Sequence, residues 1–335
     1  MQVPITVLIP TFNEENLIAQ AITCASFADE VLVIDSFSSD KTVEIAESLG
    51  CTILKRRFDN FSNQKNYAIS KARHDWILVL DADEYLTYEL REELIAAVKN
   101  PRHNSYKMPF KNYFINRFID YGSNGKKIKS RFFNRKNCKY TGLVHEQLLC
   151  EGSTGVFKGK ILHYTYKDLR HFFEKKNQYS QLQAQQLYQK KKKTGYFHLV
   201  FKPAYRFLNE YLLRLGFLDG IPGLTSTAMN GYGVLSRYVK LLVLKGEVDN
   251  PELTDYNNFT RSLMNRAKEK GFALPKDKKI YSISFFTAPL GSFFKEFLLK
   301  GRILKGKEGY IISYLMGFKT FNTKLYHWLH KRNME

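Results

Sequence analysis

The sequence lacks a glycine-rich phosphate-binding loop. Neither G-x-G-x-x-G nor G-K-[ST] occurs in its 335 residues, and both motifs bind phosphate through backbone N–H groups at the start of a helix. This absence argues against a Rossmann dehydrogenase and against a P-loop NTPase. A nucleotide bound by this chain would need carboxylates for its base and ribose, and a metal ion for its diphosphate.

Long apolar runs are also missing. No stretch of about eighteen apolar residues occurs, so we expect no transmembrane helix. The first expected strand begins within residues 1–4, so we expect no signal peptide. The four cysteines, at positions 24, 51, 138 and 150, do not have the spacing of a metal site. This cysteine usage fits a reducing cytoplasm.

Acidic residues are scarce after residue 100. Residues 1–100 contain nine Lys and Arg against sixteen Asp and Glu, whereas the rest of the chain contains 43 against 16. A strongly basic region that is also rich in Phe and Tyr suggests a polyanionic partner. Nucleic acid and an anionic membrane surface both qualify.

Four short apolar segments alternate with helical patterns in the first hundred residues. The expected strands are residues 2–9, 30–34, 51–54 and 76–80. This alternation predicts a parallel sheet covered by helices. Three of the strands are followed by polar or acidic residues, namely Asn13-Glu14, Asp35-Ser36 and Asp81-Ala82-Asp83. We expect these residues to gather at the edge where an open α/β sheet binds its ligands.

Asp81 and Asp83 follow the fourth strand. In an extended segment, residues i and i+2 point to the same side. Both carboxylates could therefore converge on a hard cation such as Mg²⁺ or Mn²⁺. The alternative is a solvated turn whose acidic residues cap the next helix. The acidic groups at the other two strand ends favour the metal site.

Several motifs follow one another along the chain: Pro10-Thr11-Phe12-Asn13-Glu14, residues 31–36 with Ser39-Asp40, Gln64-Lys65-Asn66 and Leu80-Asp81-Ala82-Asp83. Together they resemble the family 2 glycosyltransferases with the GT-A fold. The resemblance continues through residues 142–146, 162–164 and 217–220, a longer pattern similar to bacterial lipopolysaccharide inner-core β-1,4-glucosyltransferases that act on heptose. The usual Asp-Asp-Gly after the second strand is Asp35-Ser36-Phe37 here.

The resemblance implies a fold and a reaction. The fold would be an α/β, Rossmann-like mixed sheet with mainly parallel N-terminal strands, followed by a C-terminal amphipathic helical region. The enzyme would use Mg²⁺ or Mn²⁺ to transfer a hexose, glucose in the first instance, from a UDP-sugar with inversion. The acceptor would be a lipid-linked glycan such as lipopolysaccharide or lipooligosaccharide core. Polyprenyl phosphate or a protein could replace that acceptor.

The resemblance also implies roles for individual residues. Asp83, with Asp81 close by, would bind the metal, and His163 would be a third ligand or a structural histidine. Glu146 would be the catalytic base, with His145 as an alternative base or as a helper. The nucleotide-sugar site would contain Thr11, Asn13, Glu14, Asp35, Lys65, Asn66 and Asp81. Lys65 would add positive charge near the diphosphate, unless it is a solvated helix lysine.

One pattern occurs twice in the basic part of the chain. Pro-x-x-x-Phe-x-x-Glu-x-Leu-Leu-x-x-x-x-Leu-x-Gly-x-x-Gly begins at Pro203 and again 86 residues later at Pro289. Each copy predicts a helix, a glycine-containing turn and a second helix, with an apolar face flanked by basic residues. Such hairpins could lie on an anionic membrane, form a homodimer interface, or pack against a core as ordinary helices.

These patterns predict four segments. Residues 1–195 would be the catalytic domain, 196–245 the first hairpin, 246–280 a polar and partly helical linker, and 281–335 the second hairpin. We expect a cytoplasmic protein, peripheral on the inner face of the bacterial inner membrane, with no nucleic-acid partner. A nucleic-acid-binding protein is the alternative of another class, because basic residues interleaved with aromatics suit single strands. That alternative leaves the acidic strand ends without a role.

Overall fold

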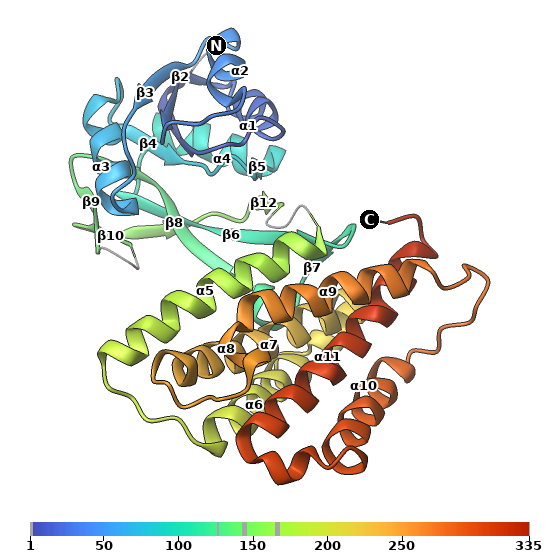
Figure 1. Ribbon diagram of the computed structural model, residues 1–335. Coiled ribbons are helices and arrows are strands. Elements are labelled where there is room, and N and C mark those ends of the chain that lie inside the picture. The colour runs from blue at the N-terminus through green and yellow to red at the C-terminus, as the bar shows by residue number, and fades with distance from the viewer. Residues whose placement is uncertain (1–2, 126, 143–145, 165–167, 335) are drawn as a thin grey trace. The chain divides into compact units, whose positions relative to one another are not determined.

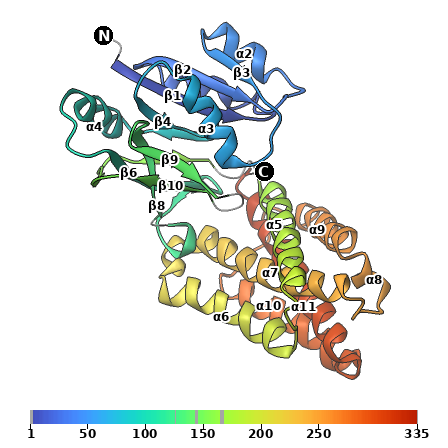
Figure 2. The same cartoon turned by 90° about the vertical axis from the view of Figure 1, so that its left-hand side faces the viewer.

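The chain divides into two structural units (Figures 1 and 2). The computed structural model describes residues 3–125, 127–142, 146–164 and 168–334. Unit 1 comprises Met1–Tyr113 and Asn124–Thr165, and unit 2 comprises Phe114–Ser123 and Tyr166–Glu335. Unit 1 contains the sheet, and unit 2 is almost entirely helical.

A mixed sheet forms the centre of unit 1, with the strand order β3-β2-β1-β4-β8-β6-β12-β5. The first four strands in this order are parallel: β3 (Thr52–Lys55), β2 (Ala28–Asp35), β1 (Val3–Thr11) and β4 (Trp76–Val79). The other four are β8 (Lys127–Asn134), β6 (Ser105–Phe114), β12 (Ile161–His163) and β5 (Glu84–Leu86), with β8 antiparallel to β4. The predicted α/β fold class with mainly parallel N-terminal strands is confirmed.

Helices cover both faces of this sheet. They are α1 (Ile18–Cys24), α2 (Thr42–Ser48), α3 (Phe61–Lys71) and α4 (Tyr88–Lys99). Along β1, Ile5, Val7 and Ile9 face a core shared with α1 and α4, whereas Leu8 faces a second core shared with α3. Because successive side chains of a strand point to opposite faces, a strand buried on both faces reads as an unbroken apolar run.

Unit 1 also contains a short hairpin outside the main sheet. Its strands, β9 (Cys138–Thr141) and β10 (Gln147–Cys150), are antiparallel, and a disulfide joins Cys138 to Cys150. The scattered cysteine spacing did not suggest this pair. The Asn66 side chain on α3 donates to Tyr140 O (2.8 Å) and accepts from Tyr140 N (3.1 Å), which fixes β9 against α3. A further short strand, β11 (Thr154–Val156), runs parallel to β6.

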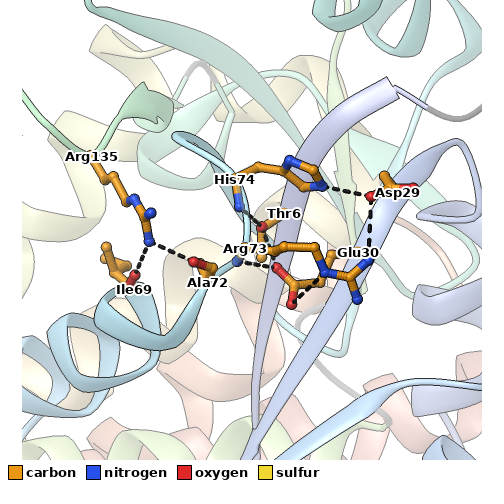
Figure 3. A network of polar contacts seen from close by, with 8 residues as sticks. All are labelled: Thr6, Asp29, Glu30, Ile69, Ala72, Arg73, His74 and Arg135. Carbon is orange, nitrogen blue, oxygen red and sulfur yellow. Dashed lines mark hydrogen bonds and ion pairs between the residues drawn. The ribbon is translucent and has the colours of Figure 1, made fainter.

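A polar network holds the connection between α3 and β4 on the sheet (Figure 3). Buried Glu30 on β2 accepts hydrogen bonds from Thr6 Oγ1 (2.5 Å) and from the backbone N–H of Arg73 (2.6 Å). The backbone N–H of His74 donates to Thr6 Oγ1 (3.2 Å). Arg135 donates to the carbonyl oxygens of Ile69 and Ala72 at the C-terminal end of α3, where the helix no longer supplies its regular N–H partners. The network thereby fixes the connection at which α3 ends and β4 begins.

Unit 2 contains the same three-helix arrangement twice. The first copy has α5 (Leu169–Gln189), α6 (Lys202–Leu208) and α7 (Gly220–Leu244), and the second has α9 (Tyr256–Phe272), α10 (Ser284–Phe294) and α11 (Gly306–His330). The short helix α8 (Pro251–Thr254) joins them, and β7 (Arg117–Ile119) belongs to the same unit. In each copy the long last helix packs against both preceding helices. All six helices contribute to one apolar core.

The two copies also share the same irregular helical turns. Each hairpin has a π-helical segment, η3 (Asn209–Leu213) or η5 (Lys295–Leu299), followed by a 3₁₀ turn, η4 (Gly216–Asp219) or η6 (Arg302–Lys305). A further π-helical segment, η2 (Phe197–Phe201), precedes α6, and a 3₁₀ turn, η1 (Gly122–Asn124), lies outside the repeat. Both copies therefore have the predicted helix, glycine-containing turn and helix.

The unit boundary lies earlier than the predicted domain boundary at residue 195. Helix α5 belongs to unit 2 because Leu169, Phe172 and Phe173 are buried in the helical core. The segment predicted as a linker, 246–280, contains α9, whose Leu263 and Met264 lie in the same core. Helix α9 thus takes in the second copy the place that α5 takes in the first. Among the helices that the structure describes, none has the length and apolar character needed to span a bilayer.

Candidate active site

The carboxyl ends of β1, β2 and β4 lie side by side at one edge of the sheet in unit 1. Thr11 of β1 is in register with Asp35 of β2, and Leu8 of β1 is in register with Val79 of β4, two residues before Asp81. Parallel pairing places the residues that follow these strands at the same edge. The strand register therefore brings together the polar strand ends that the sequence predicted.

The loops after β1 and β2 are locked to each other. Asn13 has a φ of 56°, in the left-handed region that asparagine tolerates better than most residues. Its backbone N–H donates to Ser38 Oγ (2.9 Å), and its Oδ1 accepts from the backbone N–H of Ser39 (2.8 Å). Buried Asp35 accepts from Ser38 Oγ (2.5 Å), and the backbone N–H of Glu14 donates to Thr42 Oγ1 (2.8 Å). These hydrogen bonds join the two loops into one polar corner.

Several buried polar atoms around this edge have no hydrogen-bond partner within the described part of the chain. They are Thr11 Oγ1, Gln64 Oε1, Arg131 Nε and Glu146 Oε2. Most buried polar atoms in folded proteins are hydrogen-bonded. A group of such atoms beside this polar corner suits a polar ligand.

The backbone after β4 differs from the prediction. The backbone N–H of Glu84 donates to the carbonyl of Asp81 (2.9 Å) and closes a turn, so residues 81–83 are not extended. The expectation that an extended backbone turns both carboxylates to the same side is therefore wrong. Asp81 Oδ2 lies 2.7 Å from Arg131 Nη2, whereas Asp83 Oδ2 lies 3.3 Å from His163 Nε2. The two aspartates have different partners.

Arg131 on β8 is a site residue that the sequence reasoning missed. It is buried, and its Nη2 also lies 3.2 Å from Oε1 of Glu84, which is completely buried. The only sequence signal is a charged residue directly before Phe132-Phe133, because a charge in a buried strand needs a counter-charge. The guanidinium group of Arg131 therefore forms ion pairs with both carboxylates.

The shared arginine separates the pKa values of the two carboxylates. Burial raises the pKa of Glu84 to about 7; Arg131 opposes this effect, and the negative charge of Asp81 adds to it. Burial alone would also raise the pKa of Asp81, but Arg131, Lys65 and Lys129 together hold it well below its usual range. The pKa values of two interacting carboxylates are commonly shifted apart in this way. Asp81 is thus the ionised member of the pair.

Asp83 and His163 could hold a metal ion. Strand β12 lies between β5 and β6, so His163 is in register with Glu84 on one side and Asn112 on the other. His163 Nδ1 contacts Asn112 Oδ1 (3.0 Å), so in the neutral ring Nδ1 carries the proton and Nε2 presents its lone pair to Asp83. Two donor atoms 3.3 Å apart fit adjacent ligands of an octahedral Mg²⁺ or Mn²⁺, which lie about 3 Å apart.

This pair is a partial coordination shell. Within the described ranges, no three His, Cys, Asp or Glu side chains gather around a metal position. Mg²⁺ is usually bound by one or two protein carboxylates, with substrate phosphates and water completing the shell. The residues present therefore fit a metal that binds together with a diphosphate.

Lys65 and Glu146 form a second pair. Lys65 on α3 is 3% exposed, which rules out the alternative of a solvated lysine. Its Nζ lies 2.5 Å from Glu146 Oε1 and 5.1 Å from the centre of the Tyr140 ring. Lys65 also lies near enough to Asp81 to lower the pKa of that carboxyl. The predicted alternative base, His145, lies outside the described residues.

The chain is similar to known glycosyltransferases. Residues 6–159 match the model of "Glycosyl transferase family 2". An uncharacterized glycosyltransferase of Rickettsia felis is 30% identical over 71% of this chain and 89% of its own length. Lipopolysaccharide core biosynthesis glycosyltransferase LpsC of Rhizobium meliloti is 27% identical over 66% of this chain and 83% of its own length. The fold and these relatives define an enzyme that transfers a glycosyl group. The chain belongs to glycosyl transferase family 2.

Solved structures show a weaker similarity. Glucosyl-3-phosphoglycerate synthase from Mycobacterium tuberculosis, in complex with Mn²⁺ and UDP-glucose, is 20% identical with a TM-score of 0.29. The match covers 32% of this chain and 44% of that protein. The chain thus spans less than half of the length of that structure, and a similarity of this size carries no argument about activity.

Proposed function

We propose that this glycosyltransferase transfers a hexose, glucose in the first instance, from a UDP-sugar to a hydroxyl of a lipid-linked glycan, with Mg²⁺ or Mn²⁺ and with inversion. The observation that carries the proposal is the presence of two pairs near Asp81, namely Asp83 with His163 and Lys65 with Glu146. The first pair suits a metal-bound diphosphate, and the second suits a base beside the reacting sugar.

The donor would bind at the polar corner formed by the loops after β1 and β2. Thr11, Asn13, Glu14 and Asp35 would contact the base and ribose, and the unpartnered Thr11 Oγ1 supports this placement. Asp81 would border the diphosphate with its charge balanced by Arg131. Asn66 would act through the position of β9, because both polar atoms of its amide bind the backbone of Tyr140.

In the proposed reaction, the acceptor hydroxyl oxygen attacks the anomeric carbon while the bond from that carbon to the UDP oxygen breaks. UDP leaves with the electron pair of that bond, and Glu146 accepts the hydroxyl proton. Lys65 holds Glu146 Oε1, so Oε2 would receive the proton. A divalent ion held by Asp83 and His163 would supply positive charge next to the leaving diphosphate. His145 is the alternative base.

The acceptor is inferred from the relatives and from the charge of the chain. The name of LpsC places that protein in lipopolysaccharide core biosynthesis, and the basic region after residue 100 suits an anionic surface. We therefore propose a peripheral enzyme on the inner face of the bacterial inner membrane, acting on lipopolysaccharide or lipooligosaccharide core. Polyprenyl phosphate and a protein are the alternative acceptors.

Thermal unfolding with a panel of UDP-sugars, with and without Mn²⁺, tests the donor and the metal site. One UDP-sugar should raise the melting temperature of the wild type by roughly 5 °C, and only with Mn²⁺ present. Asp83→Asn should abolish this shift and the transfer of sugar. Asp75→Asn is the matched control, because Asp75 is an aspartate of unit 1 that binds Lys136 and Arg135 instead. Sugar transfer by Asp83→Asn at the wild-type rate with metal would refute the site.

A further inference from the structure

Exposed apolar side chains of unit 2 concentrate on two segments, here called the α6 hairpin (residues 197–218) and the α10 hairpin (residues 283–304). The exposed residues of the two hairpins are Phe197, Phe201, Tyr205, Leu208, Leu212, Leu213, Leu215, Phe217 and Leu218, and Ile283, Leu290, Phe294, Leu298, Leu299, Ile303 and Leu304. Leu213, Leu299 and Leu304 are 74%, 83% and 89% exposed. Exposed apolar side chains that concentrate in this way mark an interaction site.

The same positions are exposed in both copies. Leu213 corresponds to Leu299, and Leu218 corresponds to Leu304, 86 residues apart in the sequence. These leucines lie in or next to the turns that lead from α6 to α7 and from α10 to α11. The duplication has thus kept leucine at solvent-exposed turn positions, where packing within unit 2 does not require it.

Another exposed leucine of the α6 hairpin, Leu215, has an unfavourable backbone conformation. Leu215 has a φ of 57°, in the left-handed region, and the equivalent position in the second hairpin is Gly301 with a φ of 65°. A branched side chain in this region costs roughly 1–2 kcal/mol. An exposed leucine at a strained position is consistent with a function for its side chain outside the folded unit.

The charge of the hairpins has one sign at the surface. Each hairpin contains three basic residues and a single acidic one, Glu210 or Glu296. Both glutamates are buried: Glu210 pairs with Arg206, and Glu296 pairs with Lys300 (2.7 Å) and Arg302 (3.1 Å). Every acidic side chain among the described residues of these segments is therefore buried, and the exposed surface of both hairpins is apolar and basic.

The two hairpins lie next to each other in unit 2. Helix α7 packs against α5 and α6, and α11 packs against α9 and α10. The ring centroid of Tyr211 in the α6 hairpin lies 5.8 Å from that of Phe286 in the α10 hairpin. One flat partner could therefore contact both hairpins together.

We propose that the α6 and α10 hairpins dock unit 2 on the anionic surface of a lipid bilayer. Leu213, Leu218, Leu299 and Leu304 enter the boundary between headgroups and acyl chains, and basic residues such as Arg214 and Lys295 contact lipid phosphates. Apolar insertion and basic contacts together are what interfacial membrane binding requires, and the exposed surface supplies both. This inference rests on the proposed function for the location at a membrane. It adds which residues contact that membrane.

Vesicle flotation of the full-length protein tests this docking surface. Wild type should float with phosphatidylcholine vesicles that contain phosphatidylglycerol, and less so at high salt or without the anionic lipid. Leu213→Ser with Leu299→Ser should reduce vesicle binding at least tenfold, because each leucine loses its apolar contact with the bilayer. Leu182→Ser on α5 is the matched control, since Leu182 is 54% exposed in the same unit but outside both hairpins. It should float like wild type.

Two further measurements separate this proposal from its competitors. The UDP-sugar thermal shift should be unchanged in the double leucine variant, and Asp83→Asn should still float, so failure of the catalytic site and failure of docking are distinguishable. Light scattering would overturn the proposal if wild type were a dimer that the double variant dissociates while neither binds vesicles. Binding to an oligonucleotide but not to vesicles would overturn it as well, and so would flotation of the double variant at the wild-type level.

Discussion

Tyr232 of α7 and Phe318 of α11 stack face to face, with ring centroids 4.5 Å apart and ring planes 4° from parallel. These residues are equivalent in the duplicated sequence, 86 residues apart. Contact between equivalent residues is what a two-fold axis between two copies produces. Unit 2 is therefore organised like a dimer of three-helix units within one chain, with an approximate two-fold axis at this stack.

The turn of each hairpin depends on a glycine that allows close backbone contact. A Cβ atom on Gly309 would lie 1.8 Å from the carbonyl oxygen of Arg302, and one on Gly223 would lie 2.1 Å from that of Gly216. Gly309→Ala should lower the free energy of unfolding in urea by about 2–3 kcal/mol. Gly291→Ala, in α10 with open space around it, should raise it by about 0.5–1 kcal/mol. Equal stability of the two variants would contradict the importance of this contact.

Removing Arg131 should leave two carboxylates without a counter-charge. Arg131→Met is expected to lower the free energy of unfolding by about 3–5 kcal/mol, because Asp81 and completely buried Glu84 lose their shared partner. Arg261→Met is the control, since its pair with Glu174 is at the surface and should contribute at most about 1 kcal/mol. Urea titration at neutral pH measures both. A similar loss for both arginines would show that the burial of Arg131 does not matter.

The raised pKa of Glu84 makes a prediction about pH. Its folded-state pKa of about 7 lies above the unfolded value of about 4.3, so between these values the folded protein holds a proton that the unfolded chain has lost. The stability that Glu84 contributes is therefore complete below about pH 4.3 and is lost as the pH rises through about 7.

Glu84→Gln has no such proton to release. The free energy of unfolding of wild type minus that of Glu84→Gln should fall between about pH 5 and pH 7, by up to about 3 kcal/mol over the whole window. Above about pH 8 the difference should be constant. Denaturant titrations of both proteins across this range provide the measurement, and a difference that does not vary with pH would contradict the assignment.

The pair of Lys65 and Glu146 makes a prediction about turnover. Glu146→Gln should reduce kcat about 10²–10⁴-fold, because the amide cannot accept the hydroxyl proton, while the UDP-sugar thermal shift persists. Lys65→Met should weaken both donor binding and turnover, since Lys65 contacts Glu146 and lies near Asp81. Steady-state kinetics together with the thermal shift separate these effects. Wild-type kcat in Glu146→Gln would point to His145 as the base.

Much of unit 1 could be read from the sequence because its signals are local. The apolar runs of β1, β2 and β4 and their polar ends are contiguous in the chain, and parallel pairing places those ends together. Arg131 could not be read in this way, because β8 joins the sheet 50 residues after Asp81 and only the strand order places it beside β4. The turn at Asp81 was missed because the extended conformation was assumed to continue past β4.

In unit 2, the sequence alone determined that a hairpin is duplicated, since the repeated pattern is visible residue by residue. Only the tertiary structure decided that α5 and α9 complete the two copies, because their equivalence lies in packing against α7 and α11 and not in shared residues. The same division applies to the whole chain. Local patterns determine which elements form and the family to which the enzyme belongs. Contacts between distant segments determine which charges neutralise each other, and these contacts exist only once the chain has folded.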